Sequence, residues 1–139
     1  MKILLTEPQE ISESSLELLR SAGHQVVSNH DRIPDSTIGG LFIRTYTKVT
    51  SGYLDKFPAV TTIIRAGTGL DNIDLIECSK RGIEVFSSPG ANSTSVAEHA
   101  LSMMLMVLKN TRSHLANLKQ NIWRDRTLLG HELHGKTIG

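Results

Sequence analysis

Short apolar segments alternate with polar, helix-compatible segments along the first 90 residues of the chain. The apolar segments are rich in Ile, Leu, Val and Phe and are typical of short buried strands. They cover residues 2–5, 25–27, 41–43, 60–64 and 84–86. A strand, a helix and a strand at this spacing form a right-handed parallel unit. The pattern therefore predicts an α/β fold, a doubly wound parallel sheet of flavodoxin-like size.

The helix after the first strand has the clearest boundaries. Ser12 is suited to cap its start, Ile11 and Leu16 are placed as a hydrophobic staple, and Gly23 ends it. Two further short helices are expected over residues 51–56 and 73–81. The interval 29–40 is less regular, because Pro34 and the Gly39-Gly40 pair leave room for one helical turn at most. We expect a loop or a stunted helix there.

The segment after residue 91 follows a different pattern. Ser95 and Glu98 have the spacing of a capping box, and the helix that they predict is apolar on most faces. Its apolar residues are Ala100, Leu101, Met103, Met104, Leu105, Val107 and Leu108. Helical spacing continues to Trp123, and residues 130–135 are expected to form an extended loop. The long helix is either a core helix or a surface that pairs with another copy of the chain.

Composition narrows the class of protein. The chain has 139 residues, 39% apolar and 21% charged, which is the balance of a globular domain with a real core. A net charge of +1 gives no reason to expect nucleic acid or an anionic membrane as a partner. Cys78 is the only cysteine, so a reducing cytoplasm is the expected location. The sequence contains neither a signal peptide nor an apolar run long enough to span a membrane.

Candidate chemistry centres on the stretch Arg65-Ala66-Gly67-Thr68-Gly69-Leu70-Asp71-Asn72-Ile73-Asp74, between the fourth expected strand and a helix. Gly67 and Gly69 allow a ligand to approach the backbone closely, and Asp71 or Asn72 can cap the helix. Backbone amides and the Arg65 guanidinium then suit a small carboxylate. The alternative is an ordinary strand-to-helix turn in which the glycines only provide positive φ angles.

Arg44 strengthens the case for an anion site. It follows the third expected strand as Arg65 follows the fourth, and ligands of open parallel sheets bind beyond the carboxyl ends of strands. Both guanidinium groups are therefore expected to reach one crevice and to bind a carboxylate and a phosphate. Two surface arginines in water are the alternative.

The Arg65–Asp74 stretch resembles the substrate loop of the D-isomer-specific 2-hydroxyacid dehydrogenases. The match recurs in order at residues 43–45, 47–50, 81–85, 92–99 and 129–139. The segments Thr47-Lys48-Val49-Thr50 and 123–133 are most similar to a branch of the family whose 2-hydroxy acid is phosphorylated. The resemblance implies an NAD-dependent oxidoreductase that transfers a hydride between its substrate and nicotinamide.

The resemblance also implies a division of the chain and a set of site residues. Residues 1–91 are expected to be the flavodoxin-like substrate-binding domain, and residues 92–139 the crossover helices and first strand of an incomplete NAD-binding Rossmann domain. The implied substrate-binding residues are Arg44, Arg65, Ala66, Gly67 and Asn92, and the implied cofactor-binding residues are Thr68 and His99. A homodimer through residues 95–123 is the implied assembly.

The family's catalytic histidine, its glutamate partner and its catalytic arginine follow the dinucleotide glycine motif, and no residue of this chain is assigned to them. Gly67-Thr68-Gly69 lacks the third glycine of such a motif, because residue 72 is asparagine. His131 and His134 have no further ligand nearby, so no metal site is expected. The chain alone is thus expected to be inactive. Two other interpretations are a related enzyme for glyoxylate or hydroxypyruvate, and a non-enzymatic dimeric ligand-binding module.

Overall fold

The computed structural model describes residues 1–28 and 35–138, and the chain divides into two compact units, Met1–Ala91 and Asn92–Gly139. The boundary coincides with the one that the sequence suggests, while the assignment of the units to a substrate domain and a nucleotide domain stays a proposal. Within the interval 29–40, residues 29–34 lie outside the described part, and residues 35–39 form no helix.

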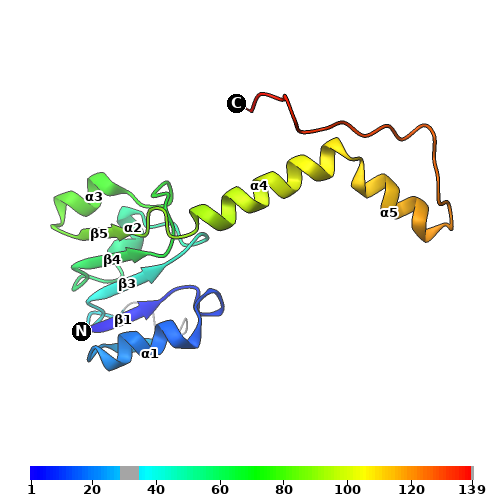
Figure 1. Ribbon diagram of the computed structural model, residues 1–139. Coiled ribbons are helices and arrows are strands. Elements are labelled where there is room, and N and C mark those ends of the chain that lie inside the picture. Colours follow the sequence, from blue (N-terminus) through cyan, green and yellow to red (C-terminus); the bar gives the residue numbers. More distant parts are fainter. Residues whose placement is uncertain (29–34, 139) are drawn as a thin grey trace. The chain divides into compact units, whose positions relative to one another are not determined.

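The first unit contains the parallel sheet that the sequence predicts (Figure 1). Its described strands are β1 (Lys2–Leu5), β2 (Gln25–Val27), β3 (Gly40–Ile43), β4 (Thr62–Arg65) and β5 (Glu84–Ser87). All pairs are parallel, and the order is β2-β1-β3-β4-β5. The order reverses between β1 and β3, so the carboxyl ends of these strands form the topological switch point where such sheets bind ligands. The flavodoxin-like arrangement is confirmed.

Successive side chains of each strand point to opposite faces of the sheet, so each face has its own set of buried residues. Leu4, Leu41 and Ile63 are neighbours in register, and they belong to a buried cluster with residues of α2 (Ser51–Leu54) and α3 (Leu75–Lys80). Ile3 and Leu5 have the opposite orientation, and they are buried together with Leu16 of α1 (Glu13–Ser21). The short 3-10 helix η1 (Pro8–Glu10) connects β1 to α1. Since helices cover both faces, the polar residues at the strand ends are the ones left for ligand chemistry.

Two helix starts in the first unit test the cap predictions. Ser12 accepts a hydrogen bond from the Ser15 amide, which confirms the predicted cap of α1. The predicted cap of α3 is wrong. Asp74 accepts from the Glu77 amide at 2.9 Å, whereas Asn72 is held elsewhere by its side chain. The helix starts later because Ile73 is buried and pairs with Val49 before the chain turns.

Replacing Asp74 by alanine is expected to lower the free energy of unfolding by about 1 kcal/mol, because a helix cap is lost. Urea unfolding of the 139-residue chain measures the change. Asp71→Ala is the matched control and should have a smaller effect, since Asp71 caps no helix. Equal losses in the two variants would contradict the assignment of the cap to Asp74.

The second unit contains α4 (Ser93–Leu108) and α5 (Thr111–Lys119). The predicted capping box is not formed, because Val96 already donates its amide to Asn92 and Ser95 lies inside the helix. The helix is also not continuous to Trp123. Asn110 adopts a left-handed conformation with φ of 50°, which separates α4 from α5. Trp123 lies beyond the end of α5 and is 88% exposed.

Neither α4 nor α5 contains a buried residue. In the extended segment after α5, Thr137 and Ile138 belong to no strand, contrary to the expected first strand at 137–139, and Gly139 lies outside the described part. A strand requires a hydrogen-bonded neighbour, and the described part of this unit contains none. No helix in the described residues combines the length and apolar character needed to cross a membrane.

Candidate functional site

Three strands deliver polar residues to the carboxyl edge of the sheet. Glu7 follows β1, Arg44 follows β3, and Arg65 ends β4 opposite Ile43 in the register. The loops after β3 and β4 are joined, because Val49 forms an isolated parallel bridge with Ile73. The candidate site therefore consists of two linked loops, residues 44–50 and 66–74, at the switch point of the sheet.

Arg65 lies directly against the glycines of its own loop. A Cβ atom at residue 67 would collide with the Arg65 guanidinium, and one at residue 69 would lie 2.8 Å from Asp71 Oδ1. Neither Gly67 nor Gly69 has a positive φ angle, so the interpretation of these glycines as positive-φ turn residues is wrong. Their function in the structure is to leave space for the side chains of Arg65 and Asp71.

The Arg65 guanidinium has no anionic partner among the described residues. Its Nε atom is buried and forms no hydrogen bond within that part of the chain. A half-buried cation without a counter-charge is unfavourable unless a ligand supplies the charge. This arrangement is suited to binding a small anion.

The backbone amides of the loop are arranged differently from the expectation. Ala66 donates its N–H to the Ile43 carbonyl at 3.0 Å, and Gly67 donates to the Arg65 carbonyl at 2.9 Å. The two amides expected to hold a carboxylate are thus already used within the chain. Thr68 is exposed, and its amide has no backbone partner in the described part.

Arg44, unlike Arg65, has a partner among the described residues of the chain, Glu10. Its Nη1 donates to the Glu10 carbonyl at 2.7 Å and lies 3.5 Å from the Glu10 carboxylate. Its Nε is buried without a described partner, as in Arg65. The structure places both arginines at one edge of the sheet on neighbouring strands, but their guanidinium groups contact different residues.

Glu7, which sequence reasoning missed as a site residue, binds the loop after β3. Its carboxylate accepts the amides of Arg44, Thr45, Tyr46 and Thr47 at 2.9–3.2 Å and the Thr47 hydroxyl at 2.8 Å. Burial alone raises the pKa of the Glu7 carboxyl, but the Thr47 hydroxyl and the amides of Tyr46, Thr47 and Thr45 lower this pKa from 4.5 to about 2. Its position two residues after the first strand was the available signal, because that strand borders the switch point.

Asn72, in the loop after β4, binds the loop after β3 through its side chain and its backbone. Its side-chain amide donates to the Arg44 carbonyl at 3.0 Å and to the Thr47 carbonyl at 2.8 Å. The Val49 amide also donates to the Asn72 carbonyl, at 2.8 Å. Asn72 therefore positions the loop that carries Arg44 relative to the loop that carries Arg65.

Asn92 and His99 belong to the second unit and are exposed there. Asn92 precedes the first residue of α4 without a side-chain cap, and His99 lies within α4. The proposed roles of Asn92 toward the substrate and of His99 toward the cofactor stay predictions.

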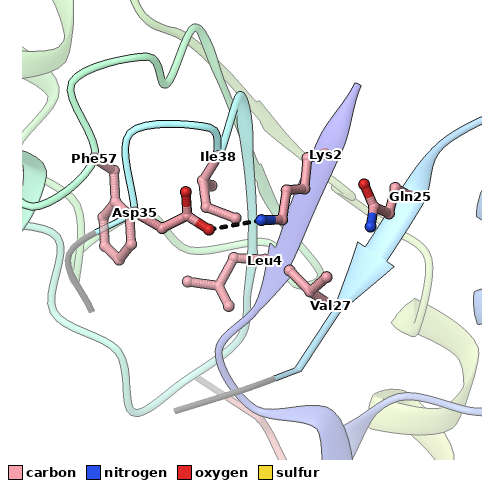
Figure 2. Close-up of a pocket in the computed structure, with 7 residues that line it drawn as sticks. All are labelled: Lys2, Leu4, Gln25, Val27, Asp35, Ile38 and Phe57. Carbon is pink, nitrogen blue, oxygen red and sulfur yellow. Dashed lines mark hydrogen bonds and ion pairs between the residues drawn. The ribbon is translucent and has the colours of Figure 1, made fainter. Parts of the chain in front are cut away.

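A separate hollow of about 190 Å³ lies against one face of β1 and β2, along the length of both strands (Figure 2). Leu4, Val27 and Phe57 give it an apolar wall, and Lys2 Nζ lies 2.6 Å from Asp35 Oδ2. The hydrogen bond from Lys2, aided by Thr37, holds the pKa of the Asp35 carboxyl well below its ordinary range. Because Lys2 and Asp35 already pair with each other, and because the hollow lies on a face of the sheet and not beyond the carboxyl ends of the strands, this hollow is not the candidate site.

Comparison with known proteins identifies the family of this chain. The family model described as "D-isomer specific 2-hydroxyacid dehydrogenase, catalytic domain" matches residues 3–128. A D-3-phosphoglycerate dehydrogenase of Methanocaldococcus jannaschii is 35% identical over 100% of this chain and 27% of its own length. A hydroxypyruvate reductase of Thermotoga maritima is 40% identical over 71% of this chain and 32% of its own length.

A solved structure shows the same arrangement. The D-lactate dehydrogenase of Aquifex aeolicus, complexed with NAD and lactic acid, superposes with a TM-score of 0.82 at 27% identity. The superposition covers 96% of this chain and 41% of that structure. The chain thus spans less than half the length of each of these three proteins.

The fold and the site define an α/β protein with two arginines at the switch-point edge of a flavodoxin-like sheet. Given the match over residues 3–128, the chain belongs to the D-isomer-specific 2-hydroxyacid dehydrogenase family. The resemblance seen in the sequence is confirmed.

Proposed function

We propose that this chain is the substrate-binding portion of an NAD-dependent D-2-hydroxyacid dehydrogenase that oxidises D-3-phosphoglycerate to 3-phosphohydroxypyruvate in serine biosynthesis. The observation that carries the proposal is the Arg65 guanidinium, which lies over Gly67 without an anionic partner among the described residues. The identity to the Methanocaldococcus jannaschii phosphoglycerate dehydrogenase over the whole chain supports the choice of substrate.

The residues of this chain bind and orient the substrate. Arg65 pairs with the carboxylate, Gly67 leaves the space in which that pair forms, and Arg44 supplies a second positive charge for the phosphate. Holding the substrate in one orientation lowers the entropic part of the barrier to reaction. NAD, when bound, supplies the hydride acceptor, and Thr68 and His99 are the residues proposed to face it.

The substrate proposal is tested with an enzyme that contains this chain together with its nucleotide-binding part. We expect kcat/KM for D-3-phosphoglycerate, or for 3-phosphohydroxypyruvate in reverse, to exceed the values for hydroxypyruvate and glyoxylate. A preference for hydroxypyruvate would favour the second candidate, which the 40% identity to a hydroxypyruvate reductase supports. If the enzyme turns over no 2-hydroxy or 2-keto acid, the remaining interpretation is the non-enzymatic ligand-binding module.

The 139-residue chain alone is expected to bind NAD only weakly and to oxidise no phosphoglycerate. The physical reason is that its sequence has no complete glycine turn to hold the pyrophosphate at a helix start. Isothermal titration calorimetry is the measurement. Micromolar binding of NAD to this chain would contradict the prediction and assign a larger share of the cofactor site to residues 1–139.

We further propose that the chain forms a homodimer through residues 95–123. The support is that α4 exposes large apolar side chains, among them Leu101, Met103 and Val107, and buries none. Apolar surface of this kind is characteristic of an interface between subunits. Cys78 is a free, buried thiol, which is compatible with the proposed cytoplasmic location.

Replacing Met103, which is 47% exposed, by glutamate is expected to raise the dimer dissociation constant at least about tenfold, because a carboxylate is placed in an apolar interface. Sedimentation velocity at micromolar concentration measures the change. Ser14→Glu is the control, since it adds the same charge to an exposed position in the first unit. A wild-type chain that sediments as a folded monomer would overturn the dimer proposal.

A further inference from the structure

One carboxylate binds all four successive amides at the start of the loop after β3. Glu7 Oε1 accepts from Arg44 and Thr47, and Oε2 accepts from Thr45 and Tyr46, at 2.9–3.2 Å. Successive amides that point to one centre form an anion-binding nest. In this structure the anion is a side chain of the protein itself, 4% exposed, from a residue that follows a different strand.

The same loop is also fixed through its carbonyl groups. Asn72 donates from one side-chain nitrogen to the carbonyls of Arg44 and Thr47, the first and last residues of the nest. Glu7 thus occupies all four amide donors of this segment, and Asn72 occupies two of its four carbonyl acceptors. Because the segment begins with Arg44, its backbone position determines where the Arg44 side chain starts.

We infer that Glu7 is a positioning residue of the candidate site: its carboxylate folds residues 44–47 into the conformation that places Arg44 for substrate binding. This inference rests on the proposed function for the part that concerns the substrate. Both carboxylate oxygens of Glu7 are occupied by the loop, so Glu7 is expected to act on the ligand only through the loop. Removing the Glu7 carboxylate should therefore weaken substrate binding only by displacing Arg44.

The first test uses the 139-residue chain and measures amide hydrogen exchange by NMR. In Glu7→Ala the amides of residues 44–47 should exchange much faster than in the wild type, while the amides of Ile63 and Ile64 in β4 keep their protection. Formate, a carboxylate small enough for the vacated nest, should restore the slow exchange. Unchanged protection without formate would overturn the inference. Glu13→Ala, an exposed carboxylate of α1, is the control.

The second test measures binding of D-3-phosphoglycerate by NMR titration of the same variants. Glu7→Ala should weaken binding about 10- to 100-fold, as expected when a contact residue is displaced, and formate should restore it. In the Arg44→Ala background the additional Glu7→Ala change should have little effect, because the two residues act as one unit. An equal loss in both backgrounds would show a general structural role and overturn the positioning role.

The two tests separate the inference from the proposed function. A wild-type chain that binds neither D-3-phosphoglycerate nor hydroxypyruvate contradicts the proposed function, while the exchange and formate results still decide whether Glu7 holds the loop. If Glu7→Ala does not fold, the wild type provides the decisive measurement. Its four nest amides should shift together in one pH titration with a common midpoint, and separate or absent titrations would overturn the inference.

Discussion

Glu7→Gln should lose about 3 kcal/mol of unfolding free energy at pH 7 relative to the wild type, and the difference should shrink as the pH falls toward 2. The folded-state pKa of Glu7 is lowered from 4.5 to about 2. A carboxyl with a lowered pKa stabilises the fold fully above pH 4.5, and this contribution is lost between pH 4.5 and 2. Glutamine has the same shape, but its NH₂ group faces amide donors that need an acceptor.

Urea unfolding at pH 7, 4 and 2.5 measures this dependence in the wild type and in Glu7→Gln. Glu13→Gln is the matched control, because Glu13 lies on the surface of α1 and forms an exposed pair with Arg20. The control should lose less than about 1 kcal/mol. A constant difference between Glu7→Gln and the wild type across this pH range would show that the Glu7 carboxylate does not supply the stability through its charge.

The sheet was predictable because each of its strands is a local apolar run. Residues 41–43 and 84–86 lie within β3 and β5, and Lys2–Leu5 is β1 without a change in bounds. The parallel direction of the strands also followed from sequence, since helical segments separate the runs in three of the four intervals. Each of these strands is determined by a few consecutive apolar residues.

The helix ends were less predictable because tertiary contacts compete with local capping chemistry. Asp71 and Asn72 are suitable cap residues, but Asn72 is used to bind the loop after β3, and the cap falls to Asp74. Ser95 and Glu98 have the spacing of a capping box, yet the chain is already helical at Ser93. Spacing alone cannot show which of two compatible starts the rest of the chain selects.

The candidate site was predictable in its location and incomplete in its residues. Arg44 and Arg65 could be placed because both follow strands that end at one edge. The nest of amides around the Glu7 carboxylate could not be predicted, because Glu7 and Thr47 are 40 positions apart and meet only when β1 and β3 pair. The bonding of the loop amides was also not predictable from the sequence: the Ala66 amide continues the hydrogen bonding between β3 and β4.

Arg65→Ala should raise the KM for D-3-phosphoglycerate in an enzyme that contains this chain, at a cost of about 2–4 kcal/mol in substrate binding. The Arg65 guanidinium has no anionic partner in the described part of the chain, so its pairing with a substrate carboxylate replaces no existing ion pair there. Arg44→Ala should act in the same direction but less, because Arg44 already contacts Glu10.

Two further variants separate charge, shape and location. Arg65→Lys keeps the charge but loses the planar fork that binds a carboxylate in two places, so it should recover only part of the affinity. Arg81→Ala removes a surface arginine that pairs with Asp55 and Glu77 near α3, and its KM should equal that of the wild type. Steady-state kinetics with saturating NAD measures the KM of each variant. If Arg65→Ala stays within about twofold of the wild type, as Arg81→Ala should, then Arg65 is a surface residue and the anion site lies elsewhere.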